Sequence, residues 1–170
     1  MSKGLIHLYY GDGKGKTTAA MGLAVRALGC GKRVVIVQFL KSSPTGELEP
    51  LQKLGATIYR GKSSSKFVFQ MNEEEKTATR LIQTENLFQA LNMPADLLIL
   101  DEACAAWNLN MVDRDLLQNT VLHKPEAQEL VLTGRDPADW MTEAADYITE
   151  MRCHRHPYEK GIPARRGIEF

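Results

Sequence analysis

Apolar residues along this chain fall into short runs that alternate with segments of helical periodicity. The runs predict six strands, at 4–10, 34–37, 56–59, 97–100, 129–135 and 146–151. The segments between them predict helices at 16–28, 47–54, 72–91, 103–109, 113–122 and 137–145. This alternation favours an α/β fold, namely a three-layer, doubly wound and mostly parallel sheet.

Two of the predicted helices have patterns that also predict their burial. The helix at 16–28 is apolar almost all round, so we expect it to be buried. The helix at 72–91 opens with Asn72 and Glu75 at the spacing of a capping box. Its predicted buried face consists of Ala78, Leu81, Ile82, Phe88 and Leu91.

The first predicted strand runs directly into a glycine-rich turn at the head of a helix. The turn reads Gly11-Asp12-Gly13-Lys14-Gly15-Lys16-Thr17-Thr18. Glycines let backbone N–H groups turn inward, the helix N-terminus adds positive partial charge, and Lys16 supplies a full charge. The hydroxyl of Thr17 would be offered to a Mg²⁺ ion that bridges the phosphates. We therefore expect a phosphate-binding loop and a P-loop NTPase fold of the RecA-like type.

The spacing of this loop departs from the usual phosphate-loop pattern. That pattern has a glycine four residues before Gly-Lys-Ser/Thr, and Tyr10 stands where this glycine belongs. The loop is thus one residue short or shifted, and Lys14 adds a second positive charge within it.

Further charged side chains are predicted to meet the loop at the carboxyl edge of the sheet. Asp101 and Glu102 follow four aliphatic residues, Lys41 lies just past the second strand, and Arg135 ends another strand. In phosphate-loop proteins such an aspartate lies beside the metal and nucleotide. Together these groups predict binding of a Mg²⁺–nucleotide triphosphate. Glu102 could serve as a base, as a water-orienting group or as a second partner of the metal.

Two segments have no regular pattern. Residues 61–72 form a long irregular stretch, and Phe67 and Phe69 within it indicate that it packs against something. Residues 152–170 are locally basic and contain Pro, Gly and aromatic residues, which favours a structured C-terminal wrap over a disordered end.

Composition limits the class of protein. The 170 residues fit one domain spanning 1–170, with 44% hydrophobic and 25% charged residues. Lys+Arg and Asp+Glu number 21 each, so net charge indicates neither nucleic acid nor an anionic membrane as partner. No apolar run approaches the roughly 20 residues needed to span a bilayer. Three cysteines without Cys-x-x-Cys spacing indicate free thiols in a reducing cytoplasm.

Taken together, the motifs resemble the ATP:corrinoid adenosyltransferases of cobalamin biosynthesis and salvage. The loop from Gly11 resembles that family's shortened phosphate loop, and further similar stretches follow in the same order over nearly the whole chain. These stretches are 31–39, 98–102, 132–135, 149–151, 156–158, 161–162 and 167–170.

The resemblance implies a transferase in which cobalt(I) of a reduced corrinoid attacks the 5′ carbon of ATP and triphosphate leaves. No catalytic base is then needed, and the family binds ATP reversed relative to ordinary phosphate-loop proteins. The resemblance implies phosphate contacts by residues 13–18, a nucleotide contact by Arg135, and a metal, Mg²⁺ or Mn²⁺, held by Asp101 or Glu102 with Thr17. Lys16, Thr17 and Glu102 are the expected catalytic residues, with Gly11, Asp12 and Lys41 also binding nucleotide.

The resemblance also assigns a role to the aromatic pair. Phe67 and Phe69 fall where the family commonly has Phe-Thr-Trp, whose rings lie against the corrin and displace its lower axial ligand. Phe69 keeps a flat apolar group but lacks the indole N–H. The expected partners are ATP, a corrinoid and an electron donor such as a reduced flavoprotein, and the family suggests a homodimer.

Two other classes remain open from the residues alone. One is a small P-loop kinase or ATPase. The other is a nucleotide-switched binding module like the partition-type ATPases, whose loops also carry two lysines. Their extra lysine usually starts the loop, where this chain has Gly11.

Overall fold

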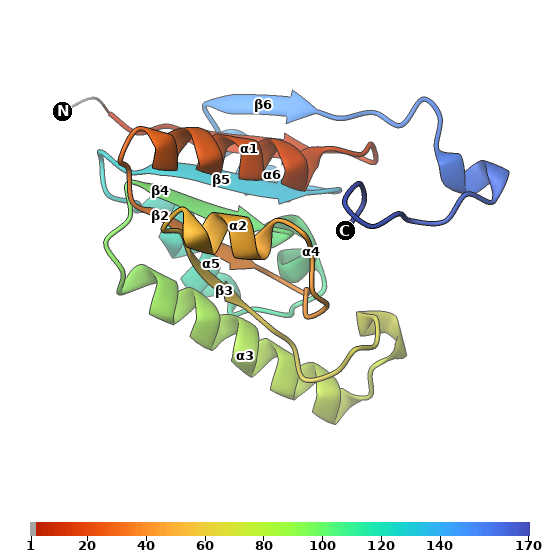
Figure 1. Ribbon diagram of the computed structural model, residues 1–170. Helices are drawn as coiled ribbons and strands as arrows, with labels where there is room; N and C mark the ends of the chain where they lie inside the picture. The colour runs from red at the N-terminus through yellow and green to blue at the C-terminus, as the bar shows by residue number, and fades with distance from the viewer. Residues whose placement is uncertain (1–2) are drawn as a thin grey trace.

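A computed structural model describes residues 3–170 and shows a six-stranded sheet with strand order β3-β2-β4-β5-β1-β6 (Figure 1). The strands are β1 (Ile6–Tyr10), β2 (Val34–Gln38), β3 (Thr57–Arg60), β4 (Leu97–Asp101), β5 (Glu129–Gly134) and β6 (Tyr147–Glu150). The helices are α1 (Lys16–Gly29), α2 (Leu48–Lys53), α3 (Glu73–Leu91), α4 (Ala103–Asn108), α5 (Arg114–Leu122) and α6 (Asp139–Ala144). Every neighbouring pair of strands is parallel.

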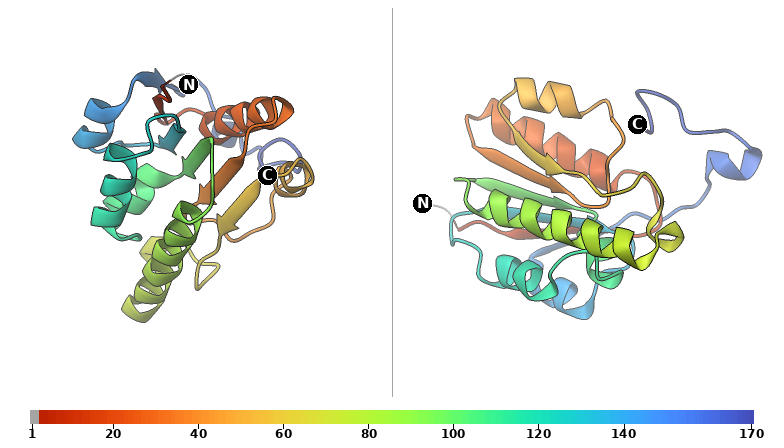
Figure 2. Two further views of the ribbon diagram at one scale, coloured as in Figure 1. Left: turned by 90° about the vertical axis from the view of Figure 1, so that its left-hand side faces the viewer. Right: turned by 90° about the horizontal axis from the view of Figure 1, so that it is seen from below.

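Helices cover both faces of the sheet (Figure 2). α1 and α2 contribute to an apolar cluster on one face, and α3, α4, α5 and α6 contribute to a larger cluster on the other. The predicted three-layer α/β class is therefore confirmed. Each predicted strand and helix is present, with its ends within two residues of the predicted ones.

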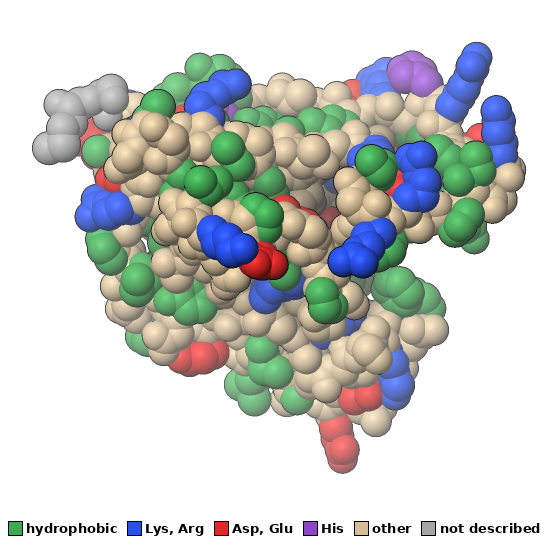
Figure 3. Space-filling view, in the orientation of Figure 1, with side chains coloured by type: hydrophobic (Ala, Val, Ile, Leu, Met, Phe, Trp, Pro, Cys, Tyr) green, Lys and Arg blue, Asp and Glu red, His purple; other side chains and the backbone are tan. Residues whose placement is uncertain are grey.

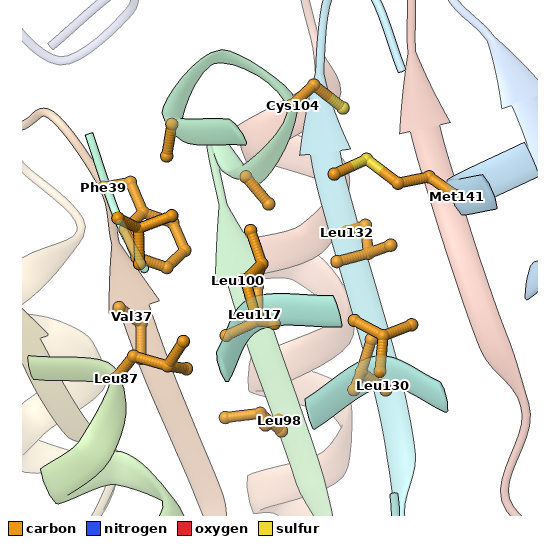
Figure 4. Close-up of a cluster of buried hydrophobic side chains, with 14 of the residues drawn as sticks. Val37, Phe39, Leu87, Leu98, Leu100, Cys104, Leu117, Leu130, Leu132 and Met141 are labelled. Atoms are coloured by element: carbon orange, nitrogen blue, oxygen red, sulfur yellow. The ribbon is translucent and has the colours of Figure 1, made fainter. Parts of the chain in front are cut away.

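The central strands are apolar without interruption because both of their faces are covered. In β4, Leu98 and Leu100 point toward α5 and α3, whereas Leu97 and Ile99 pack under α1. Figure 4 shows the larger cluster, in which side chains of β2, β4 and β5 pack against Leu87 of α3 and Leu117 of α5.

The carboxyl ends of all six strands meet at one edge, and the irregular segments gather there. The phosphate-binding loop, the segment 61–72 and the C-terminal tail all project from this edge (Figure 1). The strand order places β5 between β1 and β4, so Thr133 near the end of β5 lies between the loop after β1 and Asp101 at the end of β4.

The predicted burial of α1 is wrong in its extent. Ala20, Met21, Ala24 and Ala27 are buried against the sheet, but Val25 on the opposite side is exposed. A helix on the outer layer of a three-layer fold buries only the stripe that faces the sheet. Its high alanine content made the sequence look apolar all round.

The predicted buried face of α3 is also wrong. Leu81 and Phe88 are 66% and 52% exposed, and Leu91 is exposed as well. The buried residues are Thr79, Gln83, Leu87 and Ala90. Two of these are polar and are buried because their side chains hydrogen-bond to residues 40–63, as described below.

Both irregular segments contain one short 3₁₀ turn that the sequence pattern does not reveal. These are η1 (Val68–Gln70) and η2 (Pro157–Lys160). The tail after β6 runs outward to η2 and returns, so that Gly167 to Phe170 lie beside Thr17 and Gly46 (Figure 1). Within residues 3–170, no helix combines the length and apolar character that a membrane span requires.

Candidate active site

The phosphate-binding loop links β1 to the N-terminus of α1. Gly11 and Gly15 adopt φ angles of 108° and 117°, which residues with a side chain rarely reach. Gly15 is the N-cap residue, so the free N–H groups of the first turn of α1 point toward the loop. Lys16 folds back over the loop, and its Nζ donates a hydrogen bond to the carbonyl oxygen of Gly13 at 2.7 Å.

Asp101 is completely buried and accepts hydrogen bonds at both carboxylate oxygens. Its Oδ1 accepts hydrogen bonds from the hydroxyls of Thr17 at 2.8 Å and of Thr133 at 2.7 Å. Its Oδ2 accepts hydrogen bonds from the Lys41 ammonium at 2.6 Å and from the Gln38 amide at 3.3 Å. The carboxylate thus joins the start of α1, the ends of β4 and β5, and the loop after β2.

Glu102 stands next to this network in a strained conformation. Its φ is 61°, in the left-handed region, and its backbone N–H donates to the hydroxyl of Thr133 at 2.9 Å. Burial, together with the nearby charge of Asp101, raises the pKa of the Glu102 carboxyl above its usual range. Burial also lowers the pKa of Lys16, although Glu102 counteracts that shift.

A cavity of about 380 Å³ opens above the loop. Polar residues line most of it. The lining residues are Asp12, Gly13, Lys14, Gly15, Lys16, Thr17, Thr18, Glu102, Arg135, His156, Ile168 and Glu169. Two lysines and an arginine therefore surround a helix N-terminus, which suits a polyanion. A second cavity of about 450 Å³ lies on the other side of Thr17 and Thr18 and includes Lys41, Gly46 and Phe170.

The last strand is attached to the phosphate-binding loop. The N–H of Gly13 donates to the carbonyl oxygen of Met151 at 2.7 Å, and Met151 N–H donates to Tyr10 at 2.8 Å. Asp12 Oδ1 accepts the N–H of Cys153 at 2.9 Å, and this bond lowers the pKa of the Asp12 carboxyl. Asp12 thereby connects the loop to the tail, whose Lys and Arg side chains project at the right of Figure 3.

The aromatic pair is exposed, so the surface against which we expect these rings to pack is not another part of the described chain. Phe67 is 67% and Phe69 is 83% exposed, and their rings stack on each other with centroids 5.7 Å apart and planes 5° apart. The surrounding loop is nonetheless well connected: Lys66 pairs with Glu75 at 2.9 Å, and the Ser63 hydroxyl donates to the Glu75 carbonyl. An ordered loop thus presents a flat apolar surface to solvent.

The structure brings most of the predicted site residues together. Asp12 to Thr18, Glu102 and Arg135 line one cavity, and Thr17 connects that cavity to Asp101 and Lys41. Gly11, at the start of the same loop, lines a neighbouring hollow that also includes Arg135. Phe67 and Phe69 line neither of these cavities but lie in a separate loop at the same edge of the sheet.

Several residues of the site did not emerge from the sequence. Thr133 and Gln38 orient Asp101, and Gln83 connects the loop after β2 to the segment 61–72. A polar residue within an apolar strand, such as Thr133 in Leu-Val-Leu-Thr-Gly, is a signal that could have identified the first of these. Gln83 gave no comparable signal, because it lies on an ordinary amphipathic helix.

Comparison with known proteins identifies relatives over nearly the whole of this chain. Residues 2–170 match the family described as ATP:corrinoid adenosyltransferase BtuR/CobO/CobP. A corrinoid adenosyltransferase of Escherichia coli (strain K12) is 30% identical over 169 residues, covering 99% of this chain and 86% of the relative. A corrinoid adenosyltransferase of Pseudomonas aeruginosa is 30% identical over 171 residues, covering 99% of this chain and 84% of the relative.

Among solved structures, a KaiC-like protein from Pyrococcus horikoshii OT3 has the same fold. Its TM-score is 0.53 at 15% identity, and the match covers 92% of this chain and 76% of that protein. At this level of identity the likeness concerns the fold alone.

Proposed function

The chain belongs to the ATP:corrinoid adenosyltransferase family, and on that premise we propose that it transfers the 5′-deoxyadenosyl group of ATP to a reduced corrinoid in cobalamin biosynthesis or salvage. Cobalt(I) supplies the electron pair for the new cobalt–carbon bond, the bond between C5′ and its oxygen breaks, and triphosphate leaves. The observation that carries this proposal is the cavity where Lys14, Lys16 and Arg135 converge on a helix N-terminus.

The residues around that cavity suit a triphosphate leaving group. Negative charge grows on the triphosphate as the C5′–O bond breaks. Lys14, Lys16, Arg135 and the N–H groups at the start of α1 are positioned to stabilise that charge. Because the cobalt is itself the nucleophile, no side chain has to remove a proton from an attacking group.

The oxygen donors beside the loop fit a magnesium ion. The Thr17 hydroxyl and the Asp101 carboxylate lie 2.8 Å apart, and Glu102 lines the same cavity. Residues 3–170 contain no cluster of three or more His, Cys, Asp or Glu residues able to hold a metal by themselves. A site with few protein ligands is typical of Mg²⁺, which keeps waters and takes further oxygens from substrate phosphates. When bound, Mg²⁺ or Mn²⁺ would neutralise charge on the triphosphate.

Phe67 and Phe69 are the proposed contact for the corrin ring. Exposed, stacked aromatic rings on an ordered loop are suited to a flat, largely apolar ligand. Lys62 lies 5.9 Å from the centre of the Phe67 ring and lends positive charge to the rim of this surface. The corrin would then lie at the same sheet edge as the nucleotide, although the two groups of residues belong to different loops.

Further parts of the proposal rest on the family. They comprise a single domain over 1–170, a homodimer, a cytoplasmic location and an electron donor such as a reduced flavoprotein. Free cysteines agree with a reducing compartment. The proposal includes no nucleic-acid or membrane partner.

Anaerobic incubation with chemically reduced cobalamin and MgATP tests the proposed reaction. We expect the absorbance of the cobalt–carbon product to appear together with one equivalent of intact triphosphate. Release of phosphate from ATP without corrinoid, and without adenosylation, would instead indicate an ATPase or a nucleotide-switched module. Repeating the assay with an earlier corrinoid intermediate would establish which corrinoid the enzyme prefers.

A further inference from the structure

The ammonium of Lys41 lies between two oxygens that the proposed metal site also needs. Its Nζ is 2.6 Å from Asp101 Oδ2 and 3.2 Å from Thr17 Oγ1. A hydroxyl next to the phosphate-binding lysine and a buried carboxylate at the end of a neighbouring strand are the protein ligands expected for Mg²⁺ in such a site. The lysine side chain and a divalent cation therefore cannot both take this position.

Asp101 has no acceptor capacity to spare for a metal. Its two oxygens already accept hydrogen bonds from Thr17, Thr133, Gln38 and Lys41. These bonds use the roughly four acceptor positions that a carboxylate offers. Thr133 and Gln38 belong to strands of the sheet and are buried. Lys41 is the one fully charged partner among the four, comes from a loop, and is 26% exposed. It is therefore the partner that can leave.

Burial makes the loss of a paired cation costly for the Asp101 carboxylate. Asp101 is 0% exposed, and an ionised carboxylate that loses its directly paired cation in such a place is strongly destabilised. Lys41 provides that pairing from within the chain, and a divalent cation would provide it equally well. Exchange of one for the other keeps Asp101 paired throughout.

We propose that Lys41 is a placeholder cation that competes with the divalent metal for Thr17 and Asp101 and yields this position when the metal arrives with ATP. This inference rests on the proposed function, since it concerns the metal of that reaction. Free Mg²⁺ or Mn²⁺ without nucleotide binds weakly because it has to displace an ion pair with few new ligands in return. The metal–ATP complex displaces Lys41 because the phosphate oxygens and loop contacts contribute the remaining binding energy.

The surroundings of Lys41 permit this exchange. The residue belongs to the loop after β2, and its side chain also lines the 450 Å³ cavity beside Thr17 and Thr18. An ammonium that leaves Asp101 therefore has open space next to the phosphate-binding loop, where it can pair with the triphosphate instead. Lys41 would then be a positioning residue before nucleotide binds and a phosphate contact afterwards.

Binding of Mn²⁺ in the absence of nucleotide tests this exchange directly, with free Mn²⁺ followed by electron paramagnetic resonance. Lys41→Met removes the ammonium, and Lys41→Gln removes its charge but keeps a donor for Asp101. We expect both variants to bind one Mn²⁺ per chain about tenfold or more tightly than the wild type, because a competing positive charge has gone. Lys41→Arg keeps that charge and should bind Mn²⁺ as weakly as the wild type.

Lys53→Met is the matched control, since Lys53 forms an exposed ion pair with Glu49 away from the site. It should leave Mn²⁺ binding unchanged. Equal Mn²⁺ affinity in the wild type, Lys41→Met and Lys41→Gln would overturn the proposal. If the neutral variants unfold in chelator, recovery of the fold on adding Mn²⁺ supports the exchange and failure to recover refutes it. Adenosylation by the wild-type enzyme is measured separately, so failure of the exchange is distinguishable from failure of the proposed function.

Discussion

The N–H of Gly13 donates a hydrogen bond to the carbonyl oxygen of Met151 at 2.7 Å, which attaches the C-terminal end of the last strand to the phosphate-binding loop. A Cβ atom at Gly13 would lie 2.7 Å from that carbonyl oxygen and 2.8 Å from the carbonyl carbon of Arg152. The glycine is thus required by the close approach of a second backbone as well as by any phosphate. The shape of the loop depends on residues more than 130 positions further along the chain.

Replacement of Gly13 by alanine should therefore destabilise the protein as well as weaken ATP binding. The added methyl meets backbone rather than a movable side chain, so we expect a loss of about 1–3 kcal/mol in the free energy of unfolding. Gly22→Ala is the matched control, because its Cβ would have nothing within 4 Å and it lies inside α1. That change should stabilise the protein by about 0.5–1 kcal/mol. Urea unfolding measures both, and equal stability of the two variants would contradict the close approach.

The exposed aromatic pair leads to a second prediction. Replacing both Phe67 and Phe69 by alanine should abolish adenosylation and leave ATP binding within about a few-fold of the wild type, because neither ring lines the phosphate cavity. Thermal stability should change little, since both rings are mostly exposed. Phe88→Ala removes an exposed ring from α3 and serves as the control, with activity expected to remain. Loss of ATP binding in the double variant would be incompatible with a separate corrin surface.

The strands and the meeting of the charged groups at one edge could be predicted because they depend on local pattern. Strands buried on both faces leave continuous apolar runs, and parallel strands necessarily deliver their carboxyl ends to the same edge. Asp101 and Thr17 could therefore be placed together without knowledge of the strand order.

The partners of these groups could not be predicted because they depend on register and on long-range hydrogen bonds. Gln38 is in register with Asp101 only because β2 pairs with β4. Thr79 and Gln83 are buried on α3 because Ser63, Gly61 and Leu40 satisfy their polar atoms, which reverses the face that hydrophobicity predicts. Apolar periodicity contains no information about such contacts.

The pKa of Glu102 leads to a prediction about pH. Burial and Asp101 raise this pKa, so the fold favours the protonated carboxyl relative to the unfolded chain. The corresponding stability is complete below the unfolded value of 4.5 and is lost as pH rises through the higher folded value. Glu102→Gln imitates the protonated form. The variant's advantage over the wild type in the free energy of unfolding should be absent at low pH and grow toward neutral pH. Its adenosylation activity should be lower than that of the wild type. Urea unfolding of both proteins at pH values from below 4.5 to neutral measures this difference in stability. A variant less stable than the wild type at neutral pH would contradict the prediction.

The cysteines should differ sharply in reactivity. Burial, with a contribution from Glu102, raises the pKa of the Cys104 thiol to about 12, so the reactive thiolate is scarce at pH 8. Cys30 is exposed. Iodoacetamide followed by peptide mass spectrometry should find Cys30 alkylated in the folded protein and Cys104 alkylated only after unfolding. Rapid alkylation of Cys104 in the folded protein would mean that it is accessible and would contradict its burial.

Gln83 connects the two loops that are proposed to hold nucleotide and corrin. Its Oε1 accepts the N–H of Leu40 at 3.0 Å and its Nε2 donates to the carbonyl oxygen of Gly61, while Gly61 N–H donates to the carbonyl oxygen of Lys41 at 3.2 Å. Leu40 has a φ of 59°, a strained conformation for leucine that this hydrogen bond helps to maintain.

Gln83→Leu should therefore affect both stability and corrinoid binding. Two partly buried backbone groups, Leu40 N–H and Gly61 C=O, lose their partner, which costs about 1–3 kcal/mol in the free energy of unfolding. The segment that begins at Gly61 and carries the aromatic pair loses its link through Gln83 to Leu40 and keeps only the Gly61–Lys41 backbone hydrogen bond to that loop, so the KM for corrinoid should rise more than the KM for ATP. Leu81→Ala, on the exposed face of the same helix, is the control and should leave both KM values unchanged. A variant that is destabilised but has both KM values unaltered would assign Gln83 a purely structural role.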